Sequence, residues 1–154
     1  MDSLTEKQVR LDDLMPLFRE QLEKGKTIRF SPRGTSMLPM LRQGQDQVEL
    51  SPLPEKLCRF DIPFYQRDNG QYVLHRIIEV KGETYTCLGD NQFQKEYGVR
   101  ADQMIAVMTA FYRDGARHTV TEWPYRLYSR IWYYTRHFRY LWRRGMGFLR
   151  RQLK

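Results

Sequence analysis

The sequence predicts a mostly β protein with one helix before the strands and a basic helical tail after them. Three features indicate this class: short alternating apolar segments between turn residues, a helical apolar period near the start, and an arginine-rich aromatic end. With 154 residues, 41% of them hydrophobic, the chain suffices for one core and an appendage. We expect an N-terminal helix in residues 1–26, a β domain in residues 27–122 and a helical tail in residues 123–154.

The N-terminal segment has the apolar period of an amphipathic helix. Leu11, Leu14, Phe18 and Leu22 recur at steps of three and four residues, and acidic residues occupy the positions between them. Gly25 follows the last of these, and glycine is common just beyond the end of a helix. We expect this helix to cover one side of a sheet.

After residue 26 the apolar pattern alternates, which is the period of a β-strand. The pair Asn69-Gly70 stands between two such segments and is a strong signal for a hairpin. The predicted strands are residues 27–30, 47–50, 62–66, 72–80, 84–88 and 104–112, with residues 118–121 as a hairpin return of the last. Several short strands at close spacing favour a mostly β body.

Charge is distributed unevenly along the chain. There are 26 Lys and Arg against 18 Asp and Glu, which gives a formal net charge of +8. Residues 123–154 contain eight Arg, one Lys and no acidic residue, so residues 1–122 hold 17 basic and 18 acidic residues, a net charge of −1. The basic character therefore belongs to the tail.

The sequence shows no pattern for export or for a membrane span. Four acidic residues lie within the first 13, where a secretory signal would have a basic segment followed by an apolar run. No window approaches the roughly 18 apolar residues that a membrane span needs. We therefore expect the β domain in the cytoplasm, with Cys58 and Cys87 as reduced thiols.

In the tail, an apolar period of three and four residues runs among the arginines. A basic amphipathic helix with tryptophans is typical of a helix that lies on an anionic membrane surface. The residues expected at the membrane are Arg130, Trp132, Arg136, Arg139, Trp142 and Arg143. Two alternatives stay open: the stripe docks on the body or on a partner, or the tail binds nucleic acid, which the absence of a helix-turn-helix pattern disfavours.

The segment Gly34-Thr35-Ser36-Met37-Leu38-Pro39 presents a serine at a bend. Gly34 permits a tight turn, and Pro39 fixes its own φ. His75 follows 39 residues later, and the intervening hairpin can return it to the bend. An imidazole with an ordinary pKa of ~6.5 is suited to take a proton from a serine hydroxyl near neutral pH. Ser36 and His75 are therefore a candidate nucleophile and general base.

Two carboxylates follow His75 in the chain. Asp90, in Gly89-Asp90-Asn91, can cap a turn and support the backbone of the site, and Glu96 is a second carboxylate able to orient an imidazole. From local sequence alone, an ordinary Asx turn explains Asp90 about as well as a role in the site does. Glu96 by itself has the character of an isolated surface glutamate.

Four segments together resemble the signal peptidase I and LexA-like serine peptidase superfamily. They correspond to its nucleophile, strand-entry, base and Gly-Asp-Asn boxes, in the family's order, within residues 28–107: Gly34-Thr35-Ser36-Met37-Leu38-Pro39, Gly44-Gln45-Asp46, Tyr72-Val73-Leu74-His75-Arg76 and Leu88-Gly89-Asp90-Asn91. The resemblance implies a coiled, mostly antiparallel β-structure that binds a substrate segment as an added strand.

The resemblance also implies roles for single residues. Ser36 is in the nucleophile position, and His75 is in the base position, where bacterial signal peptidases and LexA-like repressors usually have Lys. The histidine makes this chain more similar to the endoplasmic-reticulum, archaeal and sporulation-type signal peptidases, which pair Ser with His and use a downstream Asp. That Asp falls on Glu96 here, and Asp90 stays open as the orienting group.

The implied oxyanion hole rests on the backbone N–H of Ser36. Gly34, Met37 and Asn91 are the expected supporting residues. Some relatives have a hydroxyl side chain two residues before the nucleophile, and Gly34 has none to offer.

The leading hypothesis is a serine endopeptidase that cleaves a leader or signal segment of a peptide or protein precursor, with no metal and no cofactor. One alternative is a catalytically silent peptide-binding or scaffold module of the same fold, and another is nucleic-acid binding through the tail. Only the acidic helix precedes Ser36, where signal peptidases usually carry a membrane helix. We therefore expect the protein in the cytoplasm, peripherally bound at the inner membrane face.

Overall fold

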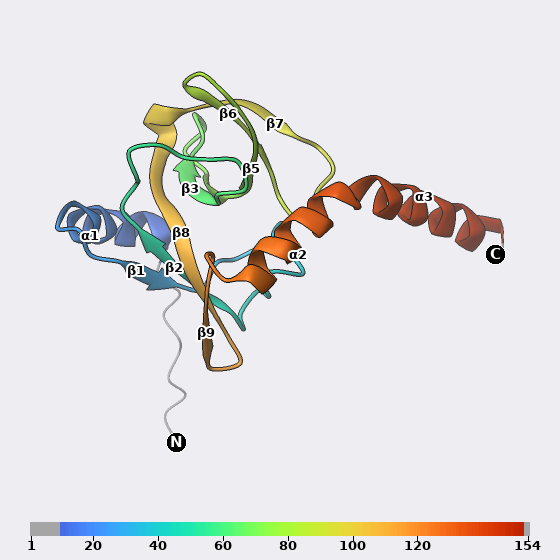
Figure 1. The fold of residues 1–154 in the computed structure, drawn as a ribbon, viewed down its shortest axis with the longest axis horizontal. Helices are drawn as coiled ribbons and strands as arrows, with labels where there is room; N and C mark the ends of the chain where they lie inside the picture. Colours follow the sequence, from blue (N-terminus) through green and yellow to red (C-terminus); the bar gives the residue numbers. More distant parts are fainter. Residues whose placement is uncertain (1–9, 153–154) are drawn as a thin grey trace.

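The computed structural model describes residues 10–152 of the chain. This part is mostly antiparallel β-structure in two sheets, with one helix before the strands and two after them (Figure 1). The predicted fold class is therefore confirmed.

Helix α1 (Leu11–Glu23) forms where the apolar period predicts it. Its inner face buries Met15, Phe18 and Leu22. The helix closes at Gly25, which has a φ of +72° and donates its N–H to the carbonyl of Leu22 at 2.9 Å. A left-handed φ of this kind favours glycine, which explains the stop at this residue.

The larger sheet has the strand order β1-β2-β8-β3-β4, with β9 paired to β8. Its strands are β1 (Ile28–Phe30), β2 (Gln47–Ser51), β3 (Pro63–Gln66), β4 (Tyr72–Leu74), β8 (Met104–Arg113) and β9 (Ala116–Thr119). Strand β8 pairs with β3 through its first half and with β2 and β9 further on. Strand β4 therefore lies at one edge.

The smaller sheet consists of β5 (Arg76–Lys81), β6 (Thr84–Leu88) and β7 (Glu96–Arg100), and a short 3-10 turn, η1 (Ala101–Gln103), leads from it into β8. The predicted strand 72–80 is divided at His75, because its two halves enter different sheets. Strand β7 was not predicted from the sequence. Its segment contains Gly98 at a φ of +69° and has one buried residue, Val99, so it lacks the alternation of a half-buried strand.

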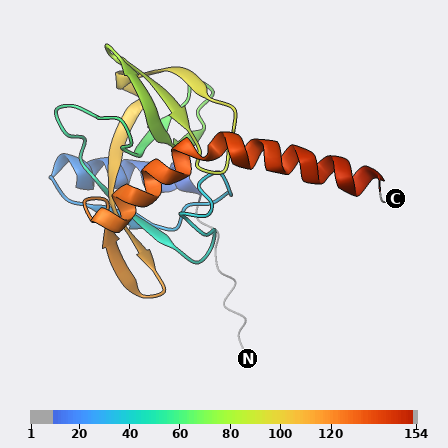
Figure 2. The same cartoon turned by 45° about the vertical axis from the view of Figure 1, so that its right-hand side comes forward.

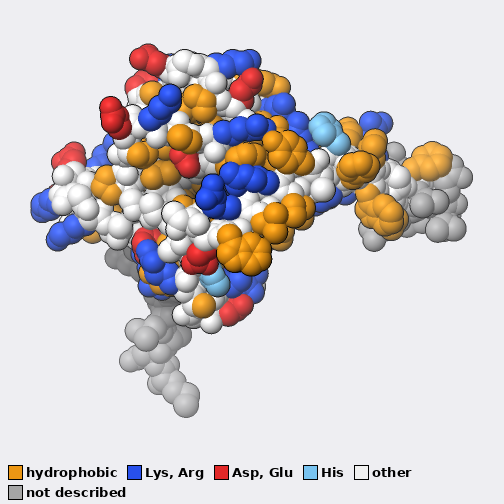
Figure 3. All heavy atoms as spheres, viewed as in Figure 1, with side chains coloured by type: hydrophobic (Ala, Val, Ile, Leu, Met, Phe, Trp, Pro, Cys, Tyr) orange, Lys and Arg blue, Asp and Glu red, His pale blue; other side chains and the backbone are white. Residues whose placement is uncertain are grey.

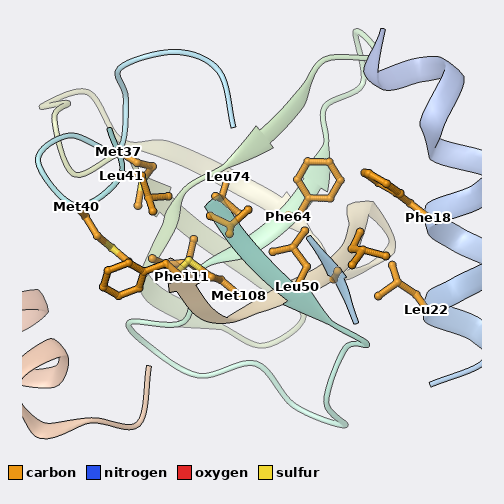
Figure 4. Close-up of a cluster of buried hydrophobic side chains, with 14 of the residues drawn as sticks. Phe18, Leu22, Met37, Met40, Leu41, Leu50, Phe64, Leu74, Met108 and Phe111 are labelled. Atoms are coloured by element: carbon orange, nitrogen blue, oxygen red, sulfur yellow. The ribbon is translucent and has the colours of Figure 1, made fainter. Parts of the chain in front are cut away.

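Two apolar clusters hold these layers together. The first lies between α1 and the larger sheet and reaches the segment after Ser36 through Met37, Met40 and Leu41 (Figure 4). The second joins the two sheets, with Tyr65 from β3 and Ile77 from β5 among its members. The loop that carries Ser36 is thus anchored in the same core as the strands.

The tail forms two helices, α2 (Trp123–Tyr134) and α3 (Arg136–Gln152), which join at Thr135. Helix α2 lies against the β-sheets, whereas α3 extends away from them in both ribbon views (Figures 1 and 2). Within residues 10–152, no helix combines the length and the apolar content that crossing a membrane requires.

Candidate active site

Ser36 and His75 line one cavity of about 320 Å³. The segment 32–37 forms one wall, and strand β4 with His75 forms another. Leu41, Arg67, Gln71 and Gln92 complete the lining. The fold thus brings together the two residues that the sequence predicts as nucleophile and base, although 39 positions separate them.

The backbone around Ser36 is held by the segment Gly89-Asp90-Asn91. The N–H of Asn91 donates to the carbonyl of Ser36 at 2.8 Å, and its side-chain amide donates to the carbonyl of Thr35 at 3.1 Å. At Gly89, an added Cβ would lie 2.7 Å from the carbonyl oxygen of Ser36, closer than real Cβ contacts. Only glycine therefore allows this approach, and Asn91 holds the backbone of the turn at Thr35 and Ser36.

Gly34 and Met37, the other two residues expected to support Ser36, lie in different surroundings. Met37 is buried in the apolar cluster and fixes the turn from inside. Gly34 is exposed and has a φ of +92°, a conformation that a residue with a side chain rarely adopts. The turn therefore depends on glycine at position 34 for its backbone.

His75 is the single residue between β4 and β5, and 4% of it is exposed. Its Nδ1 lies 3.5 Å from the hydroxyl of Tyr65 and 3.7 Å from Oε2 of Glu96. The hydroxyl of Tyr65 donates to the same Oε2 at 2.7 Å. Because these groups face Nδ1, a proton on Nδ1 is favoured, and Nε2 is left as the basic nitrogen.

Glu96, the first residue of β7, forms a two-pronged ion pair with Arg67. The guanidinium donates from Nε at 2.8 Å and from Nη2 at 2.7 Å. These hydrogen bonds lower the pKa of Glu96 below its ordinary value, so its carboxylate is charged at neutral pH. A fixed negative charge beside Nδ1 favours the protonated form of His75 and is the arrangement that a general base of this type requires.

Burial lowers the pKa of His75 from its ordinary 6.5 to about 4, with the charge of Glu96 opposing this shift and that of Arg67 adding to it. His75 is therefore neutral at pH 7, which is the state that a general base requires.

The same shift predicts how stability depends on pH. Between pH ~6.5 and about 4, the unfolded chain binds a proton at position 75 that the folded chain does not, so stability is full above ~6.5 and falls as the pH decreases. We expect the free energy of unfolding to fall by about 2–3 kcal/mol more in the wild type than in His75→Gln between pH 7 and 4.5. Urea denaturation at both pH values measures this difference, and equal losses in the two proteins would contradict it.

Asp90, the other candidate for orienting His75, contacts a different set of residues from Glu96. Its carboxylate accepts two hydrogen bonds from Arg76, each of 2.8 Å, and both side chains are buried. The hydroxyl of Tyr128 in α2 also donates to it, at 3.2 Å. Within the described residues Asp90 makes no hydrogen bond to His75. Glu96 is thus the carboxylate next to the imidazole, and Asp90 joins the β5 segment to the tail.

Three residues of this network were not singled out from the sequence. Arg76 follows His75 directly, Tyr65 lies within a predicted strand, and Arg67 belongs to the hairpin turn. Each makes its contact with a residue 14 to 31 positions away. The one available signal is Arg76, a charged residue next to His75 in a predicted strand that is mostly apolar.

Of the six tail residues expected at the membrane, five contact other residues of the protein and one, Trp142, is largely exposed. Trp132 donates its indole N–H to the carbonyl of Asp90 at 2.7 Å, Arg139 stacks on Trp132, and Arg143 donates to the side chain of Asn91 at 2.9 Å. Arg130 and Arg136 lie over aromatic rings of Phe60 and Tyr133. Trp142, in contrast, is 73% exposed.

Among the described residues, no group of three or more His, Cys, Asp and Glu side chains is placed to hold a metal ion. Cys58 and Cys87 are free thiols, the first exposed and the second buried.

No protein-family model, curated protein or solved structure matches the chain. The geometry of the cavity therefore carries the functional proposal.

Proposed function

We propose that the protein is a serine endopeptidase in which Ser36 is the nucleophile, His75 the general base and Glu96 the group that orients His75. The observation that carries this proposal is that Ser36 and a buried, neutral His75 line one cavity, with a charged carboxylate behind Nδ1. This order of hydroxyl, imidazole and carboxylate is the arrangement of a catalytic triad.

In the proposed reaction, Nε2 of His75 takes the hydroxyl proton as Ser36 Oγ attacks the carbonyl carbon of a peptide bond. The tetrahedral intermediate collapses to an acyl-enzyme as His75 gives the proton to the leaving amine. Water then attacks the ester as His75 takes its proton, and His75 gives that proton to Ser36 Oγ as the acid product leaves. Glu96 keeps the proton on Nδ1 throughout.

The oxyanion of the intermediate needs donors. The backbone N–H of Ser36 makes no hydrogen bond within residues 10–152 and is free to serve. Each such donor contributes about 3–4 kcal/mol to stabilising the transition state. Gly34 adds no side-chain donor, so a second donor would have to come from another group, and the enzyme is expected to be slow.

The walls of the cavity favour an extended peptide as substrate. Strand β4 pairs with β3 alone among the described strands, so its other edge is open to an added strand beside Ser36. A neighbouring cavity of about 320 Å³ shares this strand and is lined by apolar side chains, among them Leu11, Leu14, Phe30, Phe64 and Leu74, together with the charged Arg10 and Arg33. We therefore propose a leader or signal segment of a precursor, with a large apolar side chain in this second cavity.

The resemblance to the signal peptidase I and LexA-like superfamily supports the proposal. The nucleophile and base positions that it implies, Ser36 and His75, both line the cavity, and its Gly-Asp-Asn box is the segment that is hydrogen-bonded to the turn of Ser36.

A fluorophosphonate probe, which reacts with activated serines, tests the proposal. We expect the wild type to be labelled at Ser36 and the variant Ser36→Ala to remain unlabelled. Thr35→Ala is the matched control, because Thr35 is the neighbouring hydroxyl in the same cavity. Labelling of Ser36→Ala to the same extent as the wild type would refute the proposed nucleophile.

A second candidate is a peptide-binding module without turnover. It is favoured by one observation: among the described residues, no hydrogen bond joins Ser36 Oγ to His75. In unliganded enzymes such bonds are often long and form only with substrate. A wild type that binds extended apolar peptides but takes up no probe would favour this second function.

A further inference from the structure

The tail carries a continuous apolar stripe on one face. Its members follow one another at steps of three and four residues through the junction at Thr135, with one step of seven at the end, and we call them the outer stripe: Trp123, Leu127, Ile131, Tyr134, Phe138, Leu141 and Phe148. All are exposed, Trp123 and Phe138 to 74% and 77%, and so is the neighbouring Trp142. Exposed apolar side chains in a row of this length indicate a binding surface.

The opposite face of α2 is the one that packs on the β-sheets. Tyr125 and Tyr128 contact the core cluster, Ser129 is buried, and Trp132 binds the backbone of Asp90. At 100° per residue, the outer stripe lies roughly half a turn away from these positions. The stripe therefore points away from the body, and Figure 3 shows hydrophobic side chains exposed along the tail.

The charge of the tail is of one sign. Residues 123–154 hold eight Arg and one Lys and no acidic residue. Among the described side chains, no arginine of the tail forms an ion pair with a carboxylate. The positive field of this segment is thus not neutralised by the protein itself.

We propose that the outer stripe binds the surface of an anionic bilayer, with α2 and α3 lying in the plane of the interface. The apolar side chains enter the boundary between headgroups and acyl chains, and the arginines attract the anionic headgroups. The lipid-facing residues are then those of the stripe with Trp142, whereas Trp132, Arg139 and Arg143 face the body.

Charge argues against a second copy of the chain as the occupant. Two outer stripes packed on one another would bring together two tails of nine basic residues each, with no acidic residue in either. Nucleic acid is disfavoured by the character of the surface. The exposed face is a row of apolar side chains, which matches the boundary between headgroups and acyl chains and not a phosphate backbone.

Membrane binding would also bring the candidate active site close to the lipid. Arg143 in α3 bonds to Asn91, the residue that holds the turn of Ser36, and Tyr140 packs against Phe93 in the loop that follows. The proposed surface does not depend on the peptidase proposal, because its residues lie outside the cavity.

Co-sedimentation of the full chain with lipid vesicles tests the proposal. We expect binding to vesicles of phosphatidylcholine with phosphatidylglycerol, and much weaker binding to phosphatidylcholine alone. The triple variant Phe138→Ser, Leu141→Ser, Trp142→Ser is expected to lose about 100-fold in affinity for the anionic vesicles. The matched control is Leu17→Ser, Tyr97→Ser, which removes exposed apolar side chains elsewhere and should bind like the wild type.

The outcomes that overturn the proposal are distinct. One is a wild type that stays in the supernatant with anionic vesicles, and another is a triple variant that binds them as tightly as the control does. A lipid-free dimer that the triple variant loses, without lipid binding by the wild type, would assign the stripe to a second copy. RNA binding that survives in the triple variant, again without lipid binding, would assign the tail to nucleic acid.

Discussion

Asp90→Ala is expected to lower the free energy of unfolding by about 3–5 kcal/mol. The substitution leaves the guanidinium of Arg76 buried without its charge partner, since both hydrogen bonds of 2.8 Å are lost and 2% of Arg76 is exposed. It also removes the acceptor for the hydroxyl of Tyr128 in α2. Urea denaturation followed by circular dichroism at pH 7 measures the loss, which is a large part of the stability of a small domain.

A double variant separates charge from packing. In Asp90→Ala with Arg76→Met, both members of the ion pair are gone and an apolar chain of similar length fills the space. We expect it to recover much of the lost stability, because the cost of the single variant comes mainly from the uncompensated buried charge. An Asp90→Ala protein within about 1 kcal/mol of the wild type would contradict the role assigned to this pair.

The sequence predicts the strands well where one face of the strand is buried. The segment 47–50 alternates in burial, and its pattern is visible in the residue types alone. Strand β7 escapes prediction because Tyr97 and Gly98 are exposed and its pairing with β6 is a tertiary contact. Likewise, the sequence does not reveal that the strand 72–80 leaves one sheet at His75 and enters the other, since apolar β-forming residues lie on both sides of His75.

In the candidate site, too, the sequence predicts some features and leaves others undecided. Ser36 and His75 can be predicted because a serine at a bend and a histidine in a nearby strand are suited to act as nucleophile and general base. The choice between Glu96 and Asp90 cannot be made from local sequence, because it depends on which carboxylate the sheets bring to Nδ1. In the tail, periodicity gives the helix, but which of its faces docks depends on partners such as Asp90 in the body.

The second large effect is expected on the reactivity of Ser36 when His75 is replaced. Replacing it with glutamine is predicted to slow the reaction of Ser36 with the fluorophosphonate probe by about 10²- to 10⁴-fold, the usual contribution of a general base. Glutamine approximates the size of the imidazole and offers no basic nitrogen. The rate is measured from the time course of labelling at pH 7, where the wild-type imidazole is neutral because burial lowers its pKa to about 4.

Substitutions at the two carboxylates then decide which of them orients the base. Glu96→Gln is expected to slow labelling by about tenfold or more, because it removes the negative charge 3.7 Å from Nδ1 that stabilises the imidazolium. Tyr65 and Arg67 partly cover Glu96 but leave it accessible to solvent, so this variant should keep most of its stability. Asp90→Asn is expected to show the reverse, with a clear loss of stability and a labelling rate per folded molecule close to that of the wild type. If Asp90→Asn slowed labelling and Glu96→Gln did not, Asp90 would be the orienting residue, acting on His75 through its ion pair with Arg76.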